Sequence, residues 1–464
     1  MDLTRNELLA LCAMAFGLIM DGLDSSIVNI AIPVIAEEFG TDTNSIAWVS
    51  IIYFMMIAGL MLTFGRIADS GPIRKTYIIG FAIFSASSLV CGLSDNLGML
   101  VFARGIQGVG AAMLGAIAPM ICVKFLPPQK IGLAMSALMV AGSIGFGLGP
   151  LVGGVIIDLA SWQWAFFINI PIGLIAIAFA LKALPKDEKM KDAKLDLKGS
   201  MLLFVSVLSG VYILEMFSQP GQDIICLALV PVMIVCLALF VLVEKKVPFR
   251  MLNLGMFKDR MFNLAVICYL LMNLTYVGAH YLLPFYITME LGLSPTMTGA
   301  IILVPSVVTL IVSIPSGRYC DTHGRRLFSV LSCLFLLFFC VGYALVEPGM
   351  GWLILLPLGC LGGLMWGTCG ASVTSRVIDL APAEDKGMAS TLSNFLYYVG
   401  GSLGTALFAS LITFGSGTIG VPLEEIPLDD FMTGYHFTMY IAIAISIIAT
   451  LCAWAVNEKR IRSA

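Results

Sequence analysis

The sequence predicts an all-α membrane protein in which fourteen transmembrane helices form two six-helix bundles with an inserted helix pair between them. Hydrophobic residues make up 59% of the 464 residues and charged residues only 12%, with a mean hydropathy of +0.97. Soluble domains carry about 25% charged residues. Apolar stretches also recur along the whole chain, each long enough to cross about 30 Å of hydrocarbon as a helix. Finally, segments of the first half reappear in the second.

The apolar stretches give the expected spans in chain order. They cover residues 8–32, 46–68, 74–94, 97–120, 131–157, 163–184, 199–217, 223–243, 262–288, 297–319, 327–347, 351–376, 388–414 and 436–457. The first stretch is too long for a signal-peptide core and lacks a small-residue cleavage site, so we expect an uncleaved span.

Basic residues fall in alternate loops, which tests the number of spans independently. They precede the first span at Arg5, collect between Lys182 and Lys198 after the sixth, and close the chain after the fourteenth, whereas the intervening loops carry only acids. Arg104 alone lies well away from the basic side. Because cytoplasmic loops attract Lys and Arg, both termini are expected in the cytoplasm, which requires an even number of spans.

Composition also excludes several classes of function. A net charge of −3 indicates no nucleic-acid partner, and the twelve cysteines form no C-x-x-C pair or metal-ligand spacing, so we expect neither a disulfide framework nor a metal site. No G-x-x-x-x-G-K-[ST] sequence indicates use of ATP, and no cofactor is expected. His280 lies within the ninth span, where it is either a packed or water-facing side chain or a proton site.

An internal repeat relates the two ends of the chain. "GRIADSGPIRK" begins at Gly65 and "GRYCDTHGRR" at Gly317, with the matching Gly, Arg and Asp at one interval, and "PPQKIGLAMS" recurs as "PAEDKGMAST". Both halves start on the cytoplasmic side, so we expect parallel repeats related by an axis along the membrane normal. The predicted domains are residues 1–184, an inserted pair within 185–260 (about 199–217 and 223–243) and residues 261–464.

Five motifs in order resemble those of the major facilitator superfamily. "GRIADSGPIRK" is similar to its cytoplasmic loop, although Pro72 stands where that loop usually has its second Gly; "RGIQGVG" and "GFGLGPLVGG" are similar to its fourth- and antiporter-type fifth-helix motifs. "LDSSIVNIAIP" and "WQWAFFINIPIG" resemble first- and sixth-helix motifs of its fourteen-helix drug:proton antiporter branch. The resemblance covers essentially the whole chain and implies the fold and transport activity of that branch.

Two acids, Asp21 and Asp24, lie inside the first span. A charge near the bilayer centre costs about 2.5–3.5 kcal/mol, so such acids usually serve a function. Their spacing places them on one helix face, and we expect them to face the same space. Arg104 in the fourth span is expected at a similar depth, about 10–12 Å, which favours an ion pair with Asp24. We expect Asp24, with Asp21 as the alternative, to exchange a proton for substrate; otherwise the pair only joins two helices.

The repeated loop supplies the expected conformational switch. Its residues are Gly65, Asp69, Arg74 and Lys75, with Gly317, Asp321 and Arg325 in the second copy. We expect Asp69 to lie across the boundary between the halves, at the positive N-terminus of the thirteenth span, and to hold the cytoplasmic side closed. Arg74 and Lys75 either belong to this switch or only set the topology.

A glycine stripe marks the antiporter-type fifth helix. Its residues are Gly145, Gly149, Pro150, Gly153 and Gly154. Small residues every four positions let another helix approach closely, and we expect this stripe to meet the stripe of Gly400 and Gly404 between the halves. Pro150 is expected to kink the helix. Ordinary tight packing is the alternative.

The substrate site is expected near the midplane between the halves. Candidate residues are Tyr53, Tyr276, Trp366, Asn394 and Tyr398, because aromatic faces suit a lipophilic cation. The same residues could instead contact lipid or pack the bundles.

Three functions remain open from the sequence. The first is a proton-coupled antiporter that exports lipophilic, cationic drugs; the second exports an endogenous lipid or metabolite on the same scaffold. The third, a polytopic membrane enzyme, lacks any loop with clustered catalytic residues. The expected partners are the small-molecule substrate, protons and the lipid bilayer of a prokaryotic plasma membrane, and the expected state is a monomer.

Overall fold

A computed structural model describes residues 4–41, 43–187, 196–216, 222–247, 250, 252–293, 295–418 and 426–456. The first bundle contains α1 (Arg5–Phe39), α2 (Thr43–Asp69), α3 (Ile73–Gly92), α4 (Leu97–Phe125), α5 (Ile131–Leu159), α6 (Trp164–Phe167) and α7 (Asn169–Ala183). The inserted pair is α8 (Leu197–Met216) and α9 (Asp223–Lys246). The second bundle contains α10 (Arg260–Met289), α11 (Pro295–His323), α12 (Arg326–Ala344), α13 (Leu355–Cys369), α14 (Ser375–Leu380), α15 (Lys386–Ser416) and α16 (Leu428–Ala455).

The predicted fold class is confirmed. Within the described residues, thirteen helical segments are long and apolar enough to cross a membrane, and α8 adds a shorter apolar stretch, Lys198–Leu214. Two spans are less regular than expected. The sixth breaks at Ile168 into α6 and α7, and a π-helical turn, Gly370–Thr374, joins α13 to α14 within the twelfth.

Local chemistry sets the ends of α1. The Thr4 hydroxyl accepts from the Glu7 amide while the Glu7 carboxylate accepts from the Thr4 amide, a reciprocal cap that satisfies two free donors. The helix ends at Gly40, whose φ of +58° is a left-handed conformation that glycine adopts without steric cost. The long apolar segment is therefore one continuous helix of 35 residues.

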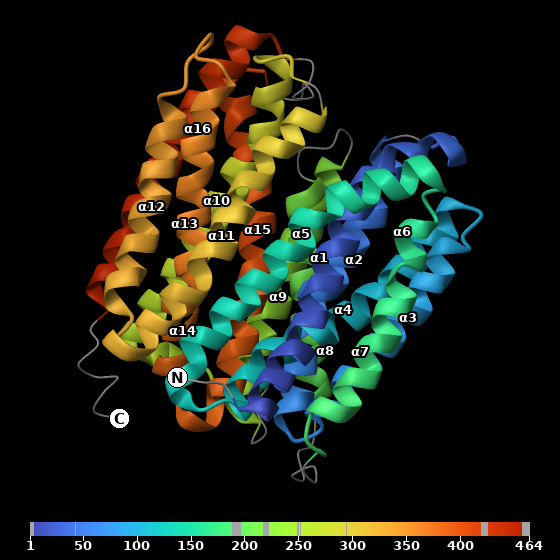
Figure 1. Cartoon of the computed structure of the whole chain (residues 1–464), viewed down its shortest axis with the longest axis vertical. Helices are drawn as coiled ribbons and strands as arrows, with labels where there is room; N and C mark the ends of the chain where they lie inside the picture. The colour runs from blue at the N-terminus through green and yellow to red at the C-terminus, as the bar shows by residue number, and fades with distance from the viewer. Residues whose placement is uncertain are drawn as a thin grey trace.

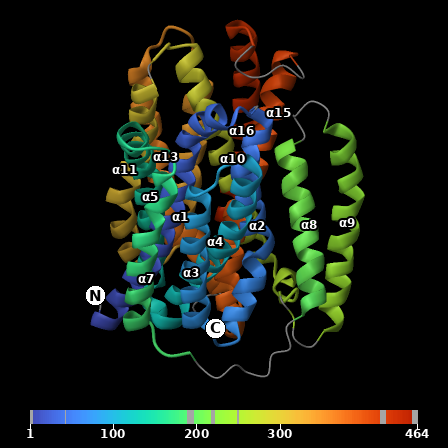
Figure 2. The same cartoon turned by 90° about the vertical axis from the view of Figure 1, so that its right-hand side faces the viewer.

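The helices form two bundles with the inserted pair at one side. In the first, α1 packs on α5, and α4 packs on α2 and α3; in the second, α10 packs on α15, and α11 on α13. The inserted helices pack on each other, and α8 packs against α2 (Figure 2). The bundles meet where α5 contacts α11 and where α15 contacts α2 and α4.

The first turn of α1 and the last turn of α16 lie at the same end of the molecule, which we call the terminal end (Figure 1). The two bundles approach each other toward this end and diverge toward the opposite end (Figure 1). The hydrogen bonds between the bundles described below begin near the middle of the helices and continue to the terminal end. The bundles are therefore joined at the terminal end in this conformation.

The glycine stripe of α5 does not meet its counterpart, so that prediction was wrong. A Cβ on Gly145 would lie 2.7 Å from the Ile19 carbonyl oxygen of α1, and a Cβ on Gly149 would overlap Ser26 of the same helix. Gly153 likewise faces Ile27. The stripe therefore brings α5 close to α1 inside the first bundle. Pro150 and Gly154 belong to α5 but lie outside the residues whose contacts are described, so the predicted kink stays a prediction.

The second stripe is also internal to its bundle. A Cβ on Gly400 would lie 2.9 Å from the Asn273 Cβ of α10, and Gly404 lies against the Leu274 backbone. Small residues permit a close approach, but their spacing does not specify which helix approaches. The glycine spacing correctly predicted close contacts between helices, but the helix partners that we predicted from it were wrong.

Candidate functional site

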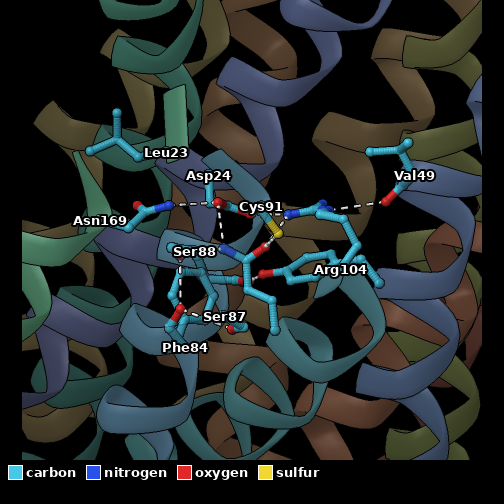
Figure 3. A network of polar contacts seen from close by, with 12 residues as sticks. Leu23, Asp24, Val49, Phe84, Ser87, Ser88, Cys91, Arg104 and Asn169 are labelled. Atoms are coloured by element: carbon cyan, nitrogen blue, oxygen red, sulfur yellow. Dashed lines mark hydrogen bonds and ion pairs between the residues drawn. The ribbon is translucent and has the colours of Figure 1, made fainter. Parts of the chain in front are cut away.

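The predicted ion pair between Asp24 and Arg104 is present inside the first bundle (Figure 3). Arg104 Nη1 lies 2.6 Å from Asp24 Oδ2, and the Arg104 and Asp24 side chains are 1% and 0% exposed. Matching the depths of two residues by helix rise was sufficient to predict this contact. A buried pair of this kind is stable only when its remaining donors and acceptors are also bonded.

Neutral amides supply those additional bonds. Asp24 Oδ1 accepts from the Gln107 amide at 2.9 Å and from the Asn169 amide at 2.7 Å. Arg104 Nε donates to the Val49 carbonyl at 3.0 Å and Nη1 to Gln107 Oε1 at 2.7 Å. The Gln107 amide also donates to Ser88 Oγ of α3, so the network joins α1, α2, α3, α4 and α7 (Figure 3).

Sequence reasoning missed Gln107 and Asn169 as site residues. Both lie within motifs quoted for the resemblance, and each places an amide inside a predicted span. A buried polar group needs a partner, so these amides were the available signal. Their partner was not predictable from that signal alone.

Asp21 has a different set of partners. Its Oδ1 accepts from the Tyr53 hydroxyl of α2 at 2.5 Å, and its Oδ2 accepts from the Tyr398 hydroxyl of α15 at 2.6 Å. The expectation that both acids face the same space was therefore wrong. Three residues leave a rotation of about 60° around the helix axis, which is enough to direct Asp24 into the first bundle and Asp21 to the boundary.

Tyr53 connects the two acids. Its hydroxyl binds Asp21, while its ring lies beneath the Arg104 guanidinium, with Cζ 4.0 Å from the ring centroid. This is cation–π distance, and the Tyr53 side chain is 0% exposed. The Tyr53 ring therefore lies between Asp21 and the Asp24–Arg104 pair, so a change of charge at Asp21 occurs close to that pair.

A series of aromatic side chains continues from Asp21 into the second bundle. Ring centroids are 5.2 Å apart for Tyr398 and Tyr397, 5.8 Å for Tyr397 and Trp366, and 5.4 Å for Trp366 and Tyr276. The series ends at His280, which stacks on Tyr276 with an interplanar angle of 15°. Three of the predicted substrate residues thus lie in one connected aromatic series.

The remaining substrate candidates make different contacts. Tyr53 binds Asp21 from the first bundle, as described above. The Asn394 amide donates to the Gly115 carbonyl of α4 at 2.7 Å, so it joins the two bundles in this conformation.

Asp321 joins the bundles at the terminal end. Its two carboxylate oxygens accept from the backbone N–H groups of Gly132 and Leu133 at 2.8 and 2.9 Å, in the first turn of α5. Gly317, one turn earlier, allows the close approach, because a Cβ there would lie 2.9 Å from the Leu133 Cα. The positive end of α5 thus stabilises the carboxylate.

Asp69 occupies the equivalent place on the other side. A Cβ on Gly387, in the first turn of α15, would lie 2.7 Å from Asp69 Oδ1, so the carboxylate is at the predicted helix N-terminus. Lys124 Nζ contacts the same oxygen at 2.9 Å. Gly65 of α2 again allows a close approach, since a Cβ there would lie 2.5 Å from the Thr391 side chain of α15. The repeat in sequence is therefore a repeat of contacts.

The comparisons with known proteins agree with this fold and its motifs. The family model described as Major Facilitator Superfamily matches residues 14–405. The chain belongs to the major facilitator superfamily. Membership identifies it as a multi-pass membrane protein and a secondary transporter of small molecules, and not as an enzyme.

Three known proteins are similar to this chain over most of its length. The riboflavin transporter RibZ of Clostridioides difficile is 30% identical over 409 residues, covering 88% of each chain. The multidrug resistance protein Stp of Mycobacterium tuberculosis is 28% identical over 426 residues, or 91% of this chain and 79% of that protein. The crystal structure of the human organic anion transporter MFSD10 (TETRAN) superposes with a TM-score of 0.67 at 14% identity, covering 97% of this chain and 100% of that one.

The basic residues of the superfamily loop stay within their own bundles. The backbone amides of Arg74 and Lys75 donate to the Asp187 carboxylate at 2.7 and 2.9 Å, and the Arg74 guanidinium donates to the Leu181 carbonyl. Arg325 Nε lies 3.0 Å from Asp379 of α14. In the contacts described, the two acids cross the boundary and these bases do not.

Proposed function

We propose that this transporter is a proton-coupled antiporter that exports lipophilic, cationic small molecules from the cytoplasm by alternating access. The observation that supports it most strongly is Asp21, a membrane-embedded carboxylate at the boundary between the bundles with two neutral hydroxyl donors. A carboxylate in that position can bind either a proton or a cationic substrate, and competition between them is the minimal requirement for exchange.

The proton-exchanging site consists of Asp24, Asp21 and Arg104. Arg104 contacts Asp24 directly, and its guanidinium lies over the Tyr53 ring, whose hydroxyl binds Asp21. The proposed substrate residues are Tyr53, Tyr276, Trp366, Asn394 and Tyr398. The aromatic series of the second bundle supports this, because cations are attracted to ring faces.

The terminal end faces the cytoplasm in this proposal, because the basic loops lie there. The conformation then has its cytoplasmic side closed by Asp321 at α5 and Asp69 at α15. Breaking these contacts would open the cytoplasmic side so that substrate can enter. Re-forming them would close that side before the substrate is released outside. The transporter acts as a monomer in a prokaryotic cytoplasmic membrane, with both termini inside.

A second candidate is export of an endogenous metabolite, and the similarity to RibZ favours it. The same aromatic series would stack on a planar neutral molecule as well as on a cation. In that case Asp21 would carry the proton alone and would make no ion pair with the substrate.

Ethidium transport in everted vesicles tests the proposed function. With an acid interior, we expect ethidium to accumulate against its gradient in the wild type and to stop accumulating when nigericin collapses the pH difference. Asp24→Asn and Asp21→Asn keep side-chain shape and remove titration, and we expect gradient-driven accumulation to be lost in at least one.

Ser25→Ala is the matched control, because Ser25 is buried beside Asp24 but its hydroxyl has no partner in the structure. Full gradient-driven transport in both aspartate variants would reject the coupling role. A wild type that ignores ethidium but exchanges riboflavin for protons would replace the drug with the metabolite.

A further inference from the structure

The Asp21 carboxylate is shared between the two bundles. Asp21 belongs to α1 and is 8% exposed, and its two oxygens are taken by one hydroxyl from each bundle, Tyr53 and Tyr398. Tyr398 therefore makes a contact in the structure in addition to the substrate contact proposed for it. It is the hydroxyl through which the second bundle binds an acid of the first.

We propose that Tyr398 is a coupling residue: its hydroxyl joins the bundles through the charged Asp21 carboxylate, and protonation of Asp21 weakens this contact so that the empty transporter can reopen to the cytoplasm. The proposal rests on the proposed function, since it assumes a cycle that is driven by protons. Binding of the proton thereby weakens one hydrogen bond between the bundles, from Tyr398 to Asp21.

Neighbouring contacts between the bundles lack this property. Asn394 donates to the Gly115 carbonyl, and the Thr391 hydroxyl donates to the Ala116 carbonyl at 3.1 Å. Backbone carbonyls do not titrate, so those two bonds are equally strong at every pH. The bond from Tyr398 ends instead on a carboxylate, whose strength as an acceptor depends on its charge.

The strength of the bond follows from that charge. An O–H donor bound to a carboxylate at 2.5–2.7 Å is charge-assisted and about twice as strong as a neutral pair, and the Tyr398 bond of 2.6 Å falls in this range. A proton on Asp21 forms one new O–H bond and turns one acceptor oxygen into a donor. The Tyr53 and Tyr398 hydroxyls then compete for the remaining acceptor oxygen of Asp21.

Asp24 is less suited to this task. It has a guanidinium partner, and its hydrogen-bond partners among the described residues belong to the first bundle, so protonation would leave Arg104 without its carboxylate and would not release the second bundle. Within the part of the chain that the structure describes, Asp21 accepts its hydrogen bonds from the neutral hydroxyls of Tyr53 and Tyr398.

The titratable and charged groups near Asp21 come from three helices besides its own. They are Tyr53 from α2, Tyr397 and Tyr398 from α15, Arg104 from α4 and, on α1 itself, Asp24. Arg104 attracts the charge of Asp21 and Asp24 repels it, and these two already form a pair. Protons and cationic substrates are therefore the species that change the charge at this position.

The order of events follows. Once substrate has left toward the opposite end, Asp21 is charged and Tyr398 holds the cytoplasmic side closed. A proton arriving from outside weakens the bond, and the bundles can then separate at the terminal end. An empty transporter without a proton stays closed, which prevents the return step from occurring uncoupled.

The test measures opening at the terminal end without any substrate. Spin labels attached through p-acetylphenylalanine at Lys182 of α7 and Leu327 of α12, both exposed, would report the distance between the bundles and leave the native cysteines in place. The purified protein in nanodiscs is measured from pH 5 to pH 9 by double electron–electron resonance.

In the wild type we expect the closed population to fall as the pH falls. Tyr398→Phe should shift the equilibrium about tenfold toward the open form at high pH and flatten the pH response, and Asp21→Asn should be open-shifted at all pH values. Asn394→Ala is the matched control, which should shift the equilibrium equally at every pH and keep the pH response.

A full wild-type pH response in Tyr398→Phe, with monodisperse and thermally stable protein, would overturn the inference. Failure of the coupling role of Tyr398 can be distinguished from failure of the proposed function. If the wild type does not transport ethidium but its opening shows a Tyr398-dependent pH response, only the drug as substrate is rejected. If pH-driven ethidium transport is intact but Tyr398 has no effect on opening, only the coupling role of Tyr398 is rejected.

Discussion

Replacing Arg104 with Met removes the cation that is bonded to Asp24 while keeping an unbranched side chain of similar length. Asp24 then retains the Gln107 and Asn169 amides, but its charge has lost its partner at 2.6 Å, and the Val49 carbonyl has lost its donor. Breaking a buried ion pair in this way costs about 3–5 kcal/mol, because the surviving charge stays buried. We expect a loss of that size in the free energy of unfolding.

A double-mutant cycle with Asp24→Asn isolates the interaction. We expect Asp24→Asn in the Arg104→Met background to recover part of the loss, with a coupling energy of about 1–3 kcal/mol. Equilibrium unfolding of the purified protein in mixed detergent micelles measures all four variants. If Arg104→Met costs less than about 1 kcal/mol, Asp24 is neutral in the native protein and the ion pair described here is wrong.

Three further predictions concern the contacts between helices. Asp321→Asn should weaken closure of the terminal end by about 1–2 kcal/mol, because a charged acceptor at the α5 N-terminus becomes neutral; an unchanged distance between labels on α7 and α12 would contradict it, and Arg74→Ala should have no such effect. Gly149→Leu should lower the yield of folded protein instead of blocking one conformation, since its side chain would overlap Ser26 of α1; size-exclusion chromatography decides, and a monodisperse product would argue against it. Tyr53→Phe should keep the fold but reduce proton-driven ethidium transport several-fold, because Asp21 loses one of its two donors; transport at the wild-type rate would exclude that role.

Depth in the membrane was predictable from the sequence. Each span was visible in its hydropathy, and the fixed rise of an α-helix converts a position in a span into a height, so Asp24 and Arg104 could be paired before any fold was known. The repeat likewise indicated that Asp69 and Asp321 have equivalent places. These inferences depend on local or periodic properties, which a single chain displays directly.

The neighbours of each helix were decided only by the tertiary structure. The glycine stripes of α5 and α15 were correctly identified as close contacts, yet each packs inside its own bundle against α1 and α10. Gln107, Asn169 and Tyr398 acquired their roles only when distant helices brought them to the two aspartates. Rotation about a helix axis and the choice of partner depend on side chains from the whole bundle, so the sequence determined the height of each group and the packing determined what it touches.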